Sequence, residues 1–289
     1  MKQSSRGFRF KFKHIALLLV GAYLLICQSC MTMRLSSSET TSYFKTQNVS
    51  FSDQTVLVDG FHLHYIQTGA NDKPTLLFVH GSPGSWDAYK RYLTDSLLLK
   101  KYRMIAIDRP GFGTSDFGQA ENLATQSKII EGLVSKIDNH QPIVLVGHSL
   151  GGPVVVKMAA DEPQLFHHLV VLAGAVDPHA ETAERWRPIL IAAPIRYLIP
   201  GALRPSNAEL WWLKSDLYDL QPLLKNITAA VTIIHGTKDP LVPFRNMQYM
   251  NDAFIHAKSI HNVAIENANH YIPWEHFDLI RDTLLKLAL

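Results

Sequence analysis

Cysteine is scarce in this chain of 289 residues: the only two, Cys27 and Cys30, lie near its N-terminus. From residue 31 onward there is no thiol, which excludes a disulfide framework, a thiolate metal site and a cysteine nucleophile from the folded part of the chain. The apolar core alone must therefore hold the fold together. An apolar fraction of 47% with 18% charged residues is ordinary for a globular protein and argues against disorder.

The chain also has little excess charge of either sign, with a net charge of +3. Five lysines and arginines, and no acidic residue, lie within residues 1–29. Without these five positive charges, the net charge of +3 becomes −2 for residues 30–289. Binding to nucleic acid depends on a basic surface, and this larger part of the chain has no basic excess. We therefore expect no nucleic-acid partner.

Residues 1–29 have the layout of a signal peptide or an N-terminal anchor. Basic residues precede a 12-residue apolar run over 15–26, as in secretory signals. The run is shorter than the about 20 apolar residues that span a bilayer. The Ser-Cys pair ending at Cys30 resembles a bacterial lipoprotein processing site, although Cys27 stands where leucine is usual.

These features predict a lipoprotein of the bacterial cell envelope, with Cys30 as the lipidation site and the folded domain outside the cytoplasm. Two alternatives remain, an uncleaved anchor that tethers the domain to the membrane and plain secretion. Residues 30–46 are polar and aperiodic, which predicts a tether. The domain itself is expected over residues 47–289.

Two short β-type runs, 55–58 and 63–66, flank Asp59-Gly60, a dipeptide typical of hairpin turns. Apolar runs of four or five residues then alternate with helical segments, as in strands covered on both faces. This alternation predicts an α/β fold with a parallel, doubly wound sheet and helices on both faces. The predicted strands are 75–79, 104–107, 143–146, 169–172, 231–234 and 259–263, and the predicted helices are 89–99, 123–137 and 154–160.

Residues 178–217 interrupt this alternation, because no buried strand pattern occurs there. The prolines of this stretch predict short helices at most, and the whole is expected to be an insertion between two strands. Its apolar residues could line a substrate pocket or form the insertion's own core. They are Trp186, Ile189, Leu190, Ile191, Tyr197, Leu198, Trp211, Trp212 and Leu213.

The strongest chemical signal is a buried strand that runs into Gly147-His148-Ser149-Leu150-Gly151 and then a helix. A serine at a sharp strand-to-helix turn needs neighbours without side chains, so that the backbone can approach closely. The following helix directs its N–H groups and positive dipole end at the serine oxygen. We therefore predict Ser149 as a nucleophile, with a plain tight turn as the alternative.

A serine hydroxyl needs a base to take its proton, and the base needs a carboxylate to orient it. Sites in parallel sheets form at the carboxyl ends of strands. Asp239 follows the 231–234 strand and His270 follows the last one. We predict Asp239 as the orienting acid and His270 as the base, with Asp177 as the alternative acid.

The predicted strand 75–79 ends in a glycine-containing loop, His80-Gly81-Ser82-Pro83-Gly84. Such a loop can turn backbone N–H groups towards the nucleophile. We predict the N–H groups of Ser82 and Leu150 as the donors of an oxyanion hole. An ordinary strand-to-helix turn is the alternative.

Together these motifs resemble the α/β-hydrolase family over about residues 50–289. The resemblance implies an eight-stranded, mostly parallel sheet with a short helical cap after the sixth strand, which is where 178–217 falls. The 80–84 loop is also similar to the HGGPG loop of proline iminopeptidases, with Ser82 in place of a glycine. The residues that carry the resemblance are His80-Gly81, Asp108 through Ser115, Gly147 through Gly152, Asp239 and His270.

The resemblance also implies the class of reaction. Dehalogenase and epoxide-hydrolase relatives use an aspartate as nucleophile, whereas Ser149 implies acyl transfer through an acyl-enzyme. This chemistry needs no metal or organic cofactor, and no cluster of ligand residues suggests one. We expect a small-molecule carboxylester with a small or medium hydrophobic acyl group, or with an aromatic group. The alternatives are an aminopeptidase or a C–C bond hydrolase with the same triad, and a non-catalytic binding protein on the same fold.

Overall fold

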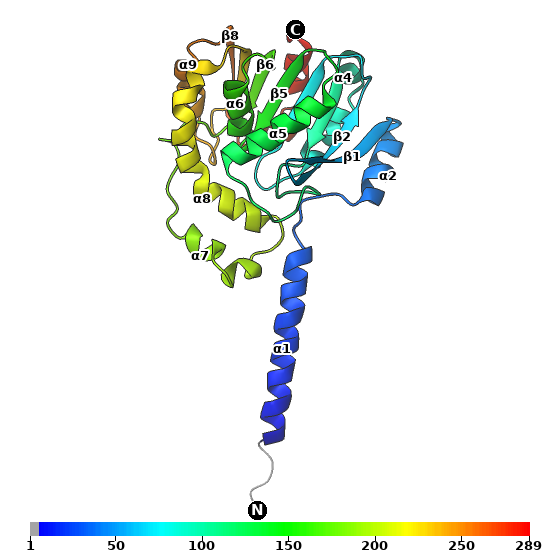
Figure 1. The fold of residues 1–289 in the computed structure, drawn as a ribbon, viewed down its shortest axis with the longest axis vertical. Coiled ribbons are helices and arrows are strands. Elements are labelled where there is room, and N and C mark those ends of the chain that lie inside the picture. The colour runs from blue at the N-terminus through cyan, green and yellow to red at the C-terminus, as the bar shows by residue number, and fades with distance from the viewer. Residues whose placement is uncertain (1–5) are drawn as a thin grey trace, which may run out of the picture.

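An eight-stranded sheet forms the centre of the molecule in a computed structural model, which describes residues 6–289 (Figure 1). The strand order is β1-β2-β4-β3-β5-β6-β7-β8. Strands β1 and β2 are antiparallel to each other, β2 is antiparallel to β4, and every other pair is parallel. The strands are β1 (Phe51–Val58), β2 (Phe61–Thr68), β3 (Thr75–Val79), β4 (Arg103–Ile107), β5 (Ile143–His148), β6 (His168–Leu172), β7 (Ala230–Gly236) and β8 (Ser259–Ile265).

The predicted strands and the hairpin are confirmed, with ends that shift by at most a few residues. Asp59 and Gly60 have φ angles of 49° and 88°. A two-residue turn of this kind needs positive φ at both positions, because its twist then matches that of the two strands. The eight-stranded, mostly parallel sheet with helices on both faces is the architecture that the sequence predicted.

Both faces of the sheet are covered, which explains the continuous apolar runs. Along β3, Leu77 and Val79 pack into one core, while Leu76 and Phe78 pack into the other. The first core lies under α5 (Leu123–Ile137), α6 (Gly151–Asp161) and α9 (Arg245–Ala253). The second lies under η1 (Trp86–Tyr89), α3 (Lys90–Leu93), α4 (Ser96–Lys101), α10 (Ile272–Glu275) and α11 (Phe277–Leu285).

The helix predicted over 89–99 is wrong in one respect, because the structure divides it into α3 and α4. Asp95 lies between them and accepts hydrogen bonds from the N–H groups of Leu97 and Leu98, both at 2.9 Å. A side chain that caps a helix in this way starts a new helix rather than continuing the old one.

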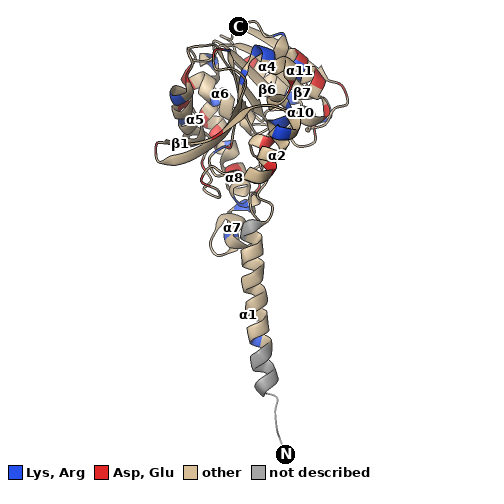
Figure 2. Ribbon diagram, turned by 90° about the vertical axis from the view of Figure 1, so that its right-hand side faces the viewer, with Lys and Arg blue, Asp and Glu red and all other residues tan. Residues whose placement is uncertain are grey.

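Helix α1 (Arg6–Ser29) projects from the body of the protein, and its described part carries few charges (Figure 2). Residues 1–5 of the predicted leader lie outside the described residues. Several apolar side chains of α1 are exposed, among them Leu17, Leu18 and Leu25, each at 70% or more. Among the described residues, no helix combines the length and the apolarity needed to cross a membrane.

The predicted tether over 30–46 is not aperiodic in its second half, which forms part of α2 (Ser37–Gln47). Ser36 and Glu39 form a reciprocal capping box at its start. Phe44 is fully buried and stacks on Phe51 and Trp86, with ring centroids 4.3 and 5.9 Å apart. One aromatic anchor within a polar segment gives no helical period, so the sequence pattern did not indicate this helix.

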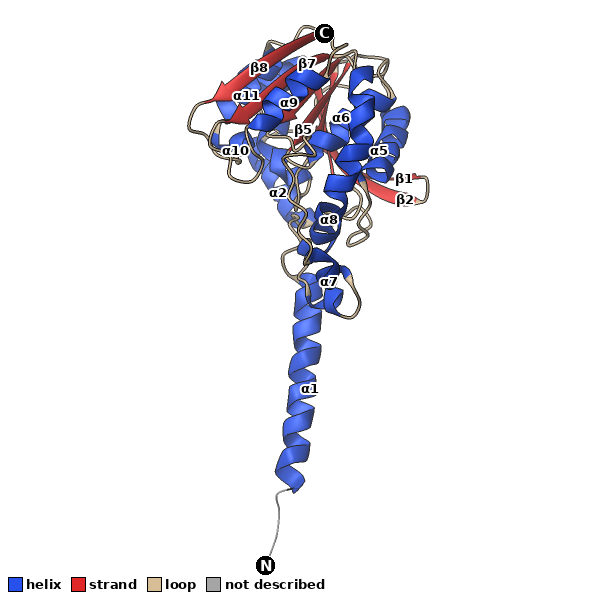
Figure 3. Cartoon of the chain, turned by 90° about the vertical axis from the view of Figure 1, so that its left-hand side faces the viewer, coloured by secondary structure: helices blue, strands red, loops and turns tan. Residues whose placement is uncertain are grey.

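An insertion connects β6 to β7 and lies between the body and α1 (Figure 3). It contains α7 (Arg187–Ile191), η2 (Ile195–Leu198), α8 (Leu203–Leu220) and η3 (Gln221–Asn226), and we call it the cap. The expectation of short helices at most is wrong for α8, which has 18 residues. Pro205 is its third residue, and the first four N–H groups of a helix have no partner within the helix, so proline is tolerated there.

We predict that Phe44→Ala destabilises the domain, because it removes an aromatic ring from the second core. Its free energy of unfolding in urea should fall by about 3 kcal/mol. Ser42→Ala, on the exposed side of the same helix, should change it by less than about 0.5 kcal/mol. Equal stability of the Phe44→Ala variant and the wild type would mean that α2 is not part of the folded domain.

Candidate active site

Ser149 lies at the turn between β5 and α6 with a φ of 54°, in the left-handed region. A Cβ atom on Gly147 would lie 2.3 Å from the Gly151 carbonyl oxygen, and one on Gly151 would lie 2.3 Å from that of Val79. Only glycine fits at these two positions. The Ser149 N–H donates to the Leu172 carbonyl of the neighbouring strand at 3.0 Å, which fixes the turn against β6.

The structure brings Asp239 and His270 into direct contact, although 31 positions separate them in the chain. The Nδ1 atom of His270 lies 2.7 Å from Oδ2 of Asp239, and the carboxylate is fully buried. The other carboxylate oxygen accepts hydrogen bonds from the N–H groups of Leu241 at 2.9 Å and Val242 at 2.8 Å. Both oxygens are therefore held, and with them the orientation of the imidazole.

Burial alone would raise the pKa of Asp239, but hydrogen bonds from His235, His270 and the Val242 N–H outweigh it and hold the pKa below its usual range. The carboxylate is thus ionised and can only accept. The Nδ1 atom of His270 must then carry the proton, which leaves Nε2 of the neutral ring as a base.

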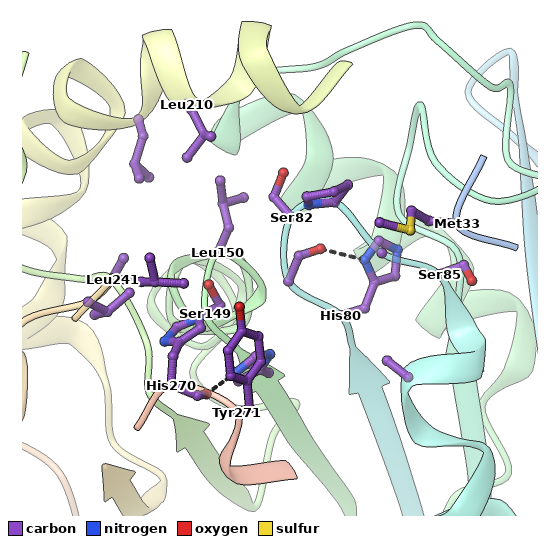
Figure 4. A pocket seen from close by; sticks show the side chains of 18 of the residues that line it. Met33, His80, Ser82, Ser85, Ser149, Leu150, Leu210, Leu241, His270 and Tyr271 are labelled. Carbon is purple, nitrogen blue, oxygen red and sulfur yellow. Dashed lines mark hydrogen bonds between the residues drawn. The ribbon is translucent and has the colours of Figure 1, made fainter. Parts of the chain in front are cut away.

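Ser149 and His270 both line one cavity of about 1140 Å³. Figure 4 shows the Ser149 hydroxyl beside the His270 ring at this cavity. Three loops that follow β5, β7 and β8 thus bring the predicted nucleophile, acid and base to one edge of the sheet.

The alternative acid, Asp177, has other partners. Its Oδ1 atom accepts the His179 N–H at 2.8 Å, and its Oδ2 atom lies 3.4 Å from Nε of Arg245. Since Asp239 already holds Nδ1 of His270, the geometry favours Asp239 over Asp177 as the orienting acid.

His148, the residue before the nucleophile, is a site residue that the sequence analysis did not identify. Its Nε2 atom donates to the His270 carbonyl oxygen at 3.1 Å, and the two rings are 4.8 Å apart. Burial, together with the charge of His270, lowers the pKa of His148 to about 3. His148 is therefore a neutral donor that fixes the His270 backbone.

The loop after β3 lies against Ser149, since a Cβ atom on Gly81 would lie 2.9 Å from Cβ of Ser149. Within residues 6–289, the N–H groups of Ser82 and Leu150 donate to no other protein group. Two free donors beside the predicted nucleophile are what an oxyanion hole requires. The Ser82 hydroxyl donates to Ser206 Oγ of α8 at 2.8 Å.

The cavity wall differs from the expected one. Of the nine apolar cap residues considered in the sequence, only Leu213 lines the cavity. Trp186, Ile189 and Tyr197 are instead about half exposed, so they neither line the cavity nor form a core within the cap. The apolar wall is made largely by residues that carried no motif: Leu35, Ala175, Leu210, Leu241 and Val242.

The segment after α1 also reaches the cavity, which was not expected of a tether. Met33, Arg34 and Leu35 line it, and Nη1 of Arg34 donates to the Gly113 carbonyl at 2.7 Å. Cys30, the predicted lipidation site, follows α1 directly and is half-buried, with its carbonyl oxygen against Gly201 of the cap. No sequence pattern marks residues 33–35, because a cavity lined by segments far apart in the chain is not visible in a short window of sequence.

Asp108 shapes the loop that follows β4. Its Oδ1 atom accepts the Trp86 N–H at 2.7 Å, and its Oδ2 atom accepts the Thr114 N–H at 2.8 Å and lies 2.8 Å from Nδ1 of His64. Gly113 passes this carboxylate so closely that a Cβ atom there would lie 2.1 Å from it.

Over the described part of the chain, no group of three or more His, Cys, Asp or Glu residues could hold a metal ion.

Comparisons with known proteins agree with this architecture. A family model described as alpha/beta hydrolase fold matches residues 74–194. Epoxide hydrolase 1 of Caenorhabditis elegans is 33% identical over 115 residues, which are 37% of this chain and 27% of that protein. The chain thus matches only about a quarter of the length of that relative.

A 2-hydroxy-6-oxononadienedioate/2-hydroxy-6-oxononatrienedioate hydrolase of Pseudomonas sp is 24% identical over 264 residues, which are 77% of this chain and 90% of that protein. Among solved structures, a bacterial membrane phospholipase A has a TM-score of 0.65 at 22% identity and covers 96% of this chain and 99% of its own. At this level of identity the structural likeness concerns the fold.

We predict that Asp239→Asn lowers turnover by about 10⁴-fold, because an amide no longer enforces the Nδ1–H tautomer of His270. Asp177→Asn should leave kcat within a few-fold of wild type.

The pKa of Asp239 is lowered by folding, so its contribution to the free energy of unfolding is present above about pH 4 and is lost as the pH falls further. Urea unfolding at several pH values tests this pH dependence, and steady-state kinetics test the two substitutions. A larger loss of kcat in Asp177→Asn than in Asp239→Asn would contradict the assignment of Asp239 as the orienting acid.

Proposed function

We propose that this chain, which has the α/β-hydrolase fold, is a serine hydrolase that cleaves a carboxylic ester. The observation that carries the proposal is the contact of 2.7 Å between His270 and the ionised Asp239, at a cavity that Ser149 also lines. A base oriented in this way beside a serine at a strand-to-helix turn is the arrangement that activates a hydroxyl.

In the proposed mechanism, Nε2 of His270 takes the proton of Ser149 while Oγ attacks the ester carbonyl. The negative charge on the carbonyl oxygen is held by the N–H groups of Ser82 and Leu150, each worth about 3 kcal/mol in the transition state. His270 then gives its proton to the leaving alkoxide, and an acyl-enzyme remains on Ser149. Water, deprotonated by His270, releases the acid and restores the hydroxyl.

A serine nucleophile separates this proposal from epoxide hydrolysis, although epoxide hydrolase 1 is among the relatives. An epoxide-opening carboxylate forms an alkyl ester, which water cleaves at its carbonyl. A serine would form an ether instead, and an ether has no carbonyl for water to attack. Epoxides are therefore disfavoured as substrates.

The proposed substrate class is an ester with a hydrophobic acyl chain. A volume of about 1140 Å³ with an apolar wall has room for a chain of medium length or longer. The likeness to a protein described as a membrane phospholipase A also favours a lipid-like ester. The second candidate is C–C bond hydrolysis, since the Pseudomonas relative aligns over 77% of this chain.

We also propose that the protein is attached to a membrane of the cell envelope, with the hydrolase domain outside the cytoplasm. The support is the charge pattern of residues 1–29 and the exposed apolar side chains of α1. Helix α1 contacts the cap, where the Gly201 N–H donates to the Cys27 carbonyl at 2.9 Å. Attachment through α1 or through a lipid on Cys30 would place the cap next to the membrane.

Ser149→Ala is expected to abolish both ester hydrolysis and labelling by a fluorophosphonate probe, since the probe reacts with the activated hydroxyl. In wild type, kcat/KM for p-nitrophenyl esters should increase from acetate to octanoate, and amino-acyl anilides should not be cleaved. Labelling that persists in Ser149→Ala would identify a different nucleophile. Faster cleavage of a vinylogous 1,5-diketone than of any ester would favour the C–C hydrolase.

For the location, we expect intact-mass analysis of the envelope fraction to give a mature N-terminus at Cys30 carrying a diacylglyceryl group. Cys30→Ser should then keep its full-length N-terminus, because no thiol remains to be modified. An intact Met1 in the wild-type protein would contradict lipoprotein processing and leave α1 as the anchor.

A further inference from the structure

A fully buried arginine, Arg109, holds the loop that follows β3. Its backbone N–H donates to Nε2 of His80 at 3.0 Å, and its Nε donates to the His80 carbonyl at 2.8 Å. Its Nη2 donates to the Gly81 carbonyl at 3.0 Å. One residue from the loop after β4 therefore fixes two successive carbonyl groups next to the nucleophile.

The other side of the Arg109 guanidinium faces the cap. Nη1 and Nη2 donate to the two carboxylate oxygens of Glu209, at 2.7 and 3.0 Å. Gln126 of α5 also accepts from Nη1 at 2.7 Å and donates to Glu209 at 3.0 Å. Both charged side chains are almost inaccessible to solvent, and such a pair persists only where every donor and acceptor is satisfied.

The Gly81 carbonyl oxygen accepts two hydrogen bonds. One comes from Arg109 Nη2, and the other comes from Nδ1 of His80 at 2.7 Å (Figure 4). Since Nε2 of His80 accepts from Arg109, the proton of this ring is on Nδ1. Burial and the Arg109 charge lower the pKa of His80 well below its usual value, so the ring stays neutral. The position of this carbonyl oxygen is thus determined from two sides.

The peptide between Gly81 and Ser82 is trans. In a trans peptide the C=O and N–H bonds point in opposite directions. Fixing the Gly81 oxygen towards Arg109 therefore directs the Ser82 N–H away from Arg109. This N–H is the predicted oxyanion donor, and the backbone at Gly81 lies against Ser149.

Helix α8 of the cap holds the same loop at a second point. Ser206 accepts the Ser82 hydroxyl at 2.8 Å, and it lies three residues before Glu209 on one face of the helix. Leu210 and Leu213 of this helix line the cavity. One helix thus contacts both the substrate space and the loop that carries the oxyanion donor.

We propose that Arg109 and Glu209 are positioning residues that aim the Ser82 N–H at the oxyanion, so that cap helix α8 helps to set the geometry of the transition state. The proposal rests on the proposed function, and it adds a role for the cap in the chemical step. Removing Glu209 takes away the partner of Arg109 on the cap. The guanidinium can then shift, which changes its hydrogen bond to the Gly81 carbonyl.

The first test is the kinetics of Glu209→Gln and Arg109→Lys with p-nitrophenyl butyrate. We expect kcat to fall about tenfold in the first variant and about a hundredfold in the second, with KM within about twofold, because loss of a full oxyanion donor costs 10²–10³-fold. The inhibition constant of an alkyl trifluoromethyl ketone, which forms an oxyanion on Ser149, should rise by the same factor as kcat/KM falls.

The matched control is Asp216→Ala. Asp216 also connects α8 to α5, by accepting the Leu123 N–H at 2.9 Å, and among the described residues it forms no hydrogen bond with the loop 80–84. We expect kcat of this variant within twofold of wild type. If Asp216→Ala lowers kcat as much as Glu209→Gln, general loosening of the cap explains the loss and the proposal fails.

A second pair of variants separates positioning from stability. Glu209→Met should be poorly stable because it leaves a buried arginine charge unpaired, and adding Arg109→Met should restore the melting temperature. We expect kcat of the double variant to remain at least tenfold below wild type. Recovery of kcat together with stability would overturn the proposal, whereas an inactive wild type or an active Ser149→Ala would overturn the proposed function instead.

Discussion

The sharp turn at Ser149 is the constraint on which the rest of the site depends. A non-glycine residue at a φ of 54° costs about 1–3 kcal/mol and persists only where its surroundings determine it. Here the Ser149 N–H is bound to β6, and its carbonyl accepts the Gly152 N–H at 2.9 Å. Because β5 lies between β3 and β6, the loops that follow the neighbouring strands meet at this turn.

The parts that could be predicted from the sequence are those fixed by local pattern or steric need. Strand β3 and helix α5 have the predicted ends, because an apolar run covered on both faces and an amphipathic helix are visible in any short window. Ser149, Asp239 and His270 each follow a strand, and strand order brings such residues together. Two of the parts missed depend on contacts between distant segments: Phe44 in a polar stretch and residues 33–35 at the cavity. The length of α8 was missed for a local reason, because a proline was taken to end a helix although the first turn tolerates it.

Of the three imidazoles of His80, His148 and His270, only that of His270 is paired with a carboxylate. His80 and His148 are buried, and burial lowers the pKa of both rings. Each uses its hydrogen bonds to hold backbone groups of the site. Of these three rings only His270 faces the ionised carboxylate of Asp239, so in the proposed mechanism a proton taken from Ser149 has one favourable destination among them. Neutral neighbours also avoid the repulsion that a second imidazolium would create.

The position of the cap also depends on buried polar groups and their partners. Helix α8 presents Ser206 to Ser82 of the loop after β3, Glu209 to Arg109 and Leu210 to the cavity, all from one face. A carboxylate buried under a helix needs a fixed partner, and Arg109 is that partner. One helix therefore lines the cavity and, in the proposed arrangement, also directs the Ser82 N–H through Glu209 and Arg109. A substitution that reshapes the cavity by shifting this helix must also move Glu209, so under the proposed function the choice of acyl chain and the rate of its transfer are physically coupled.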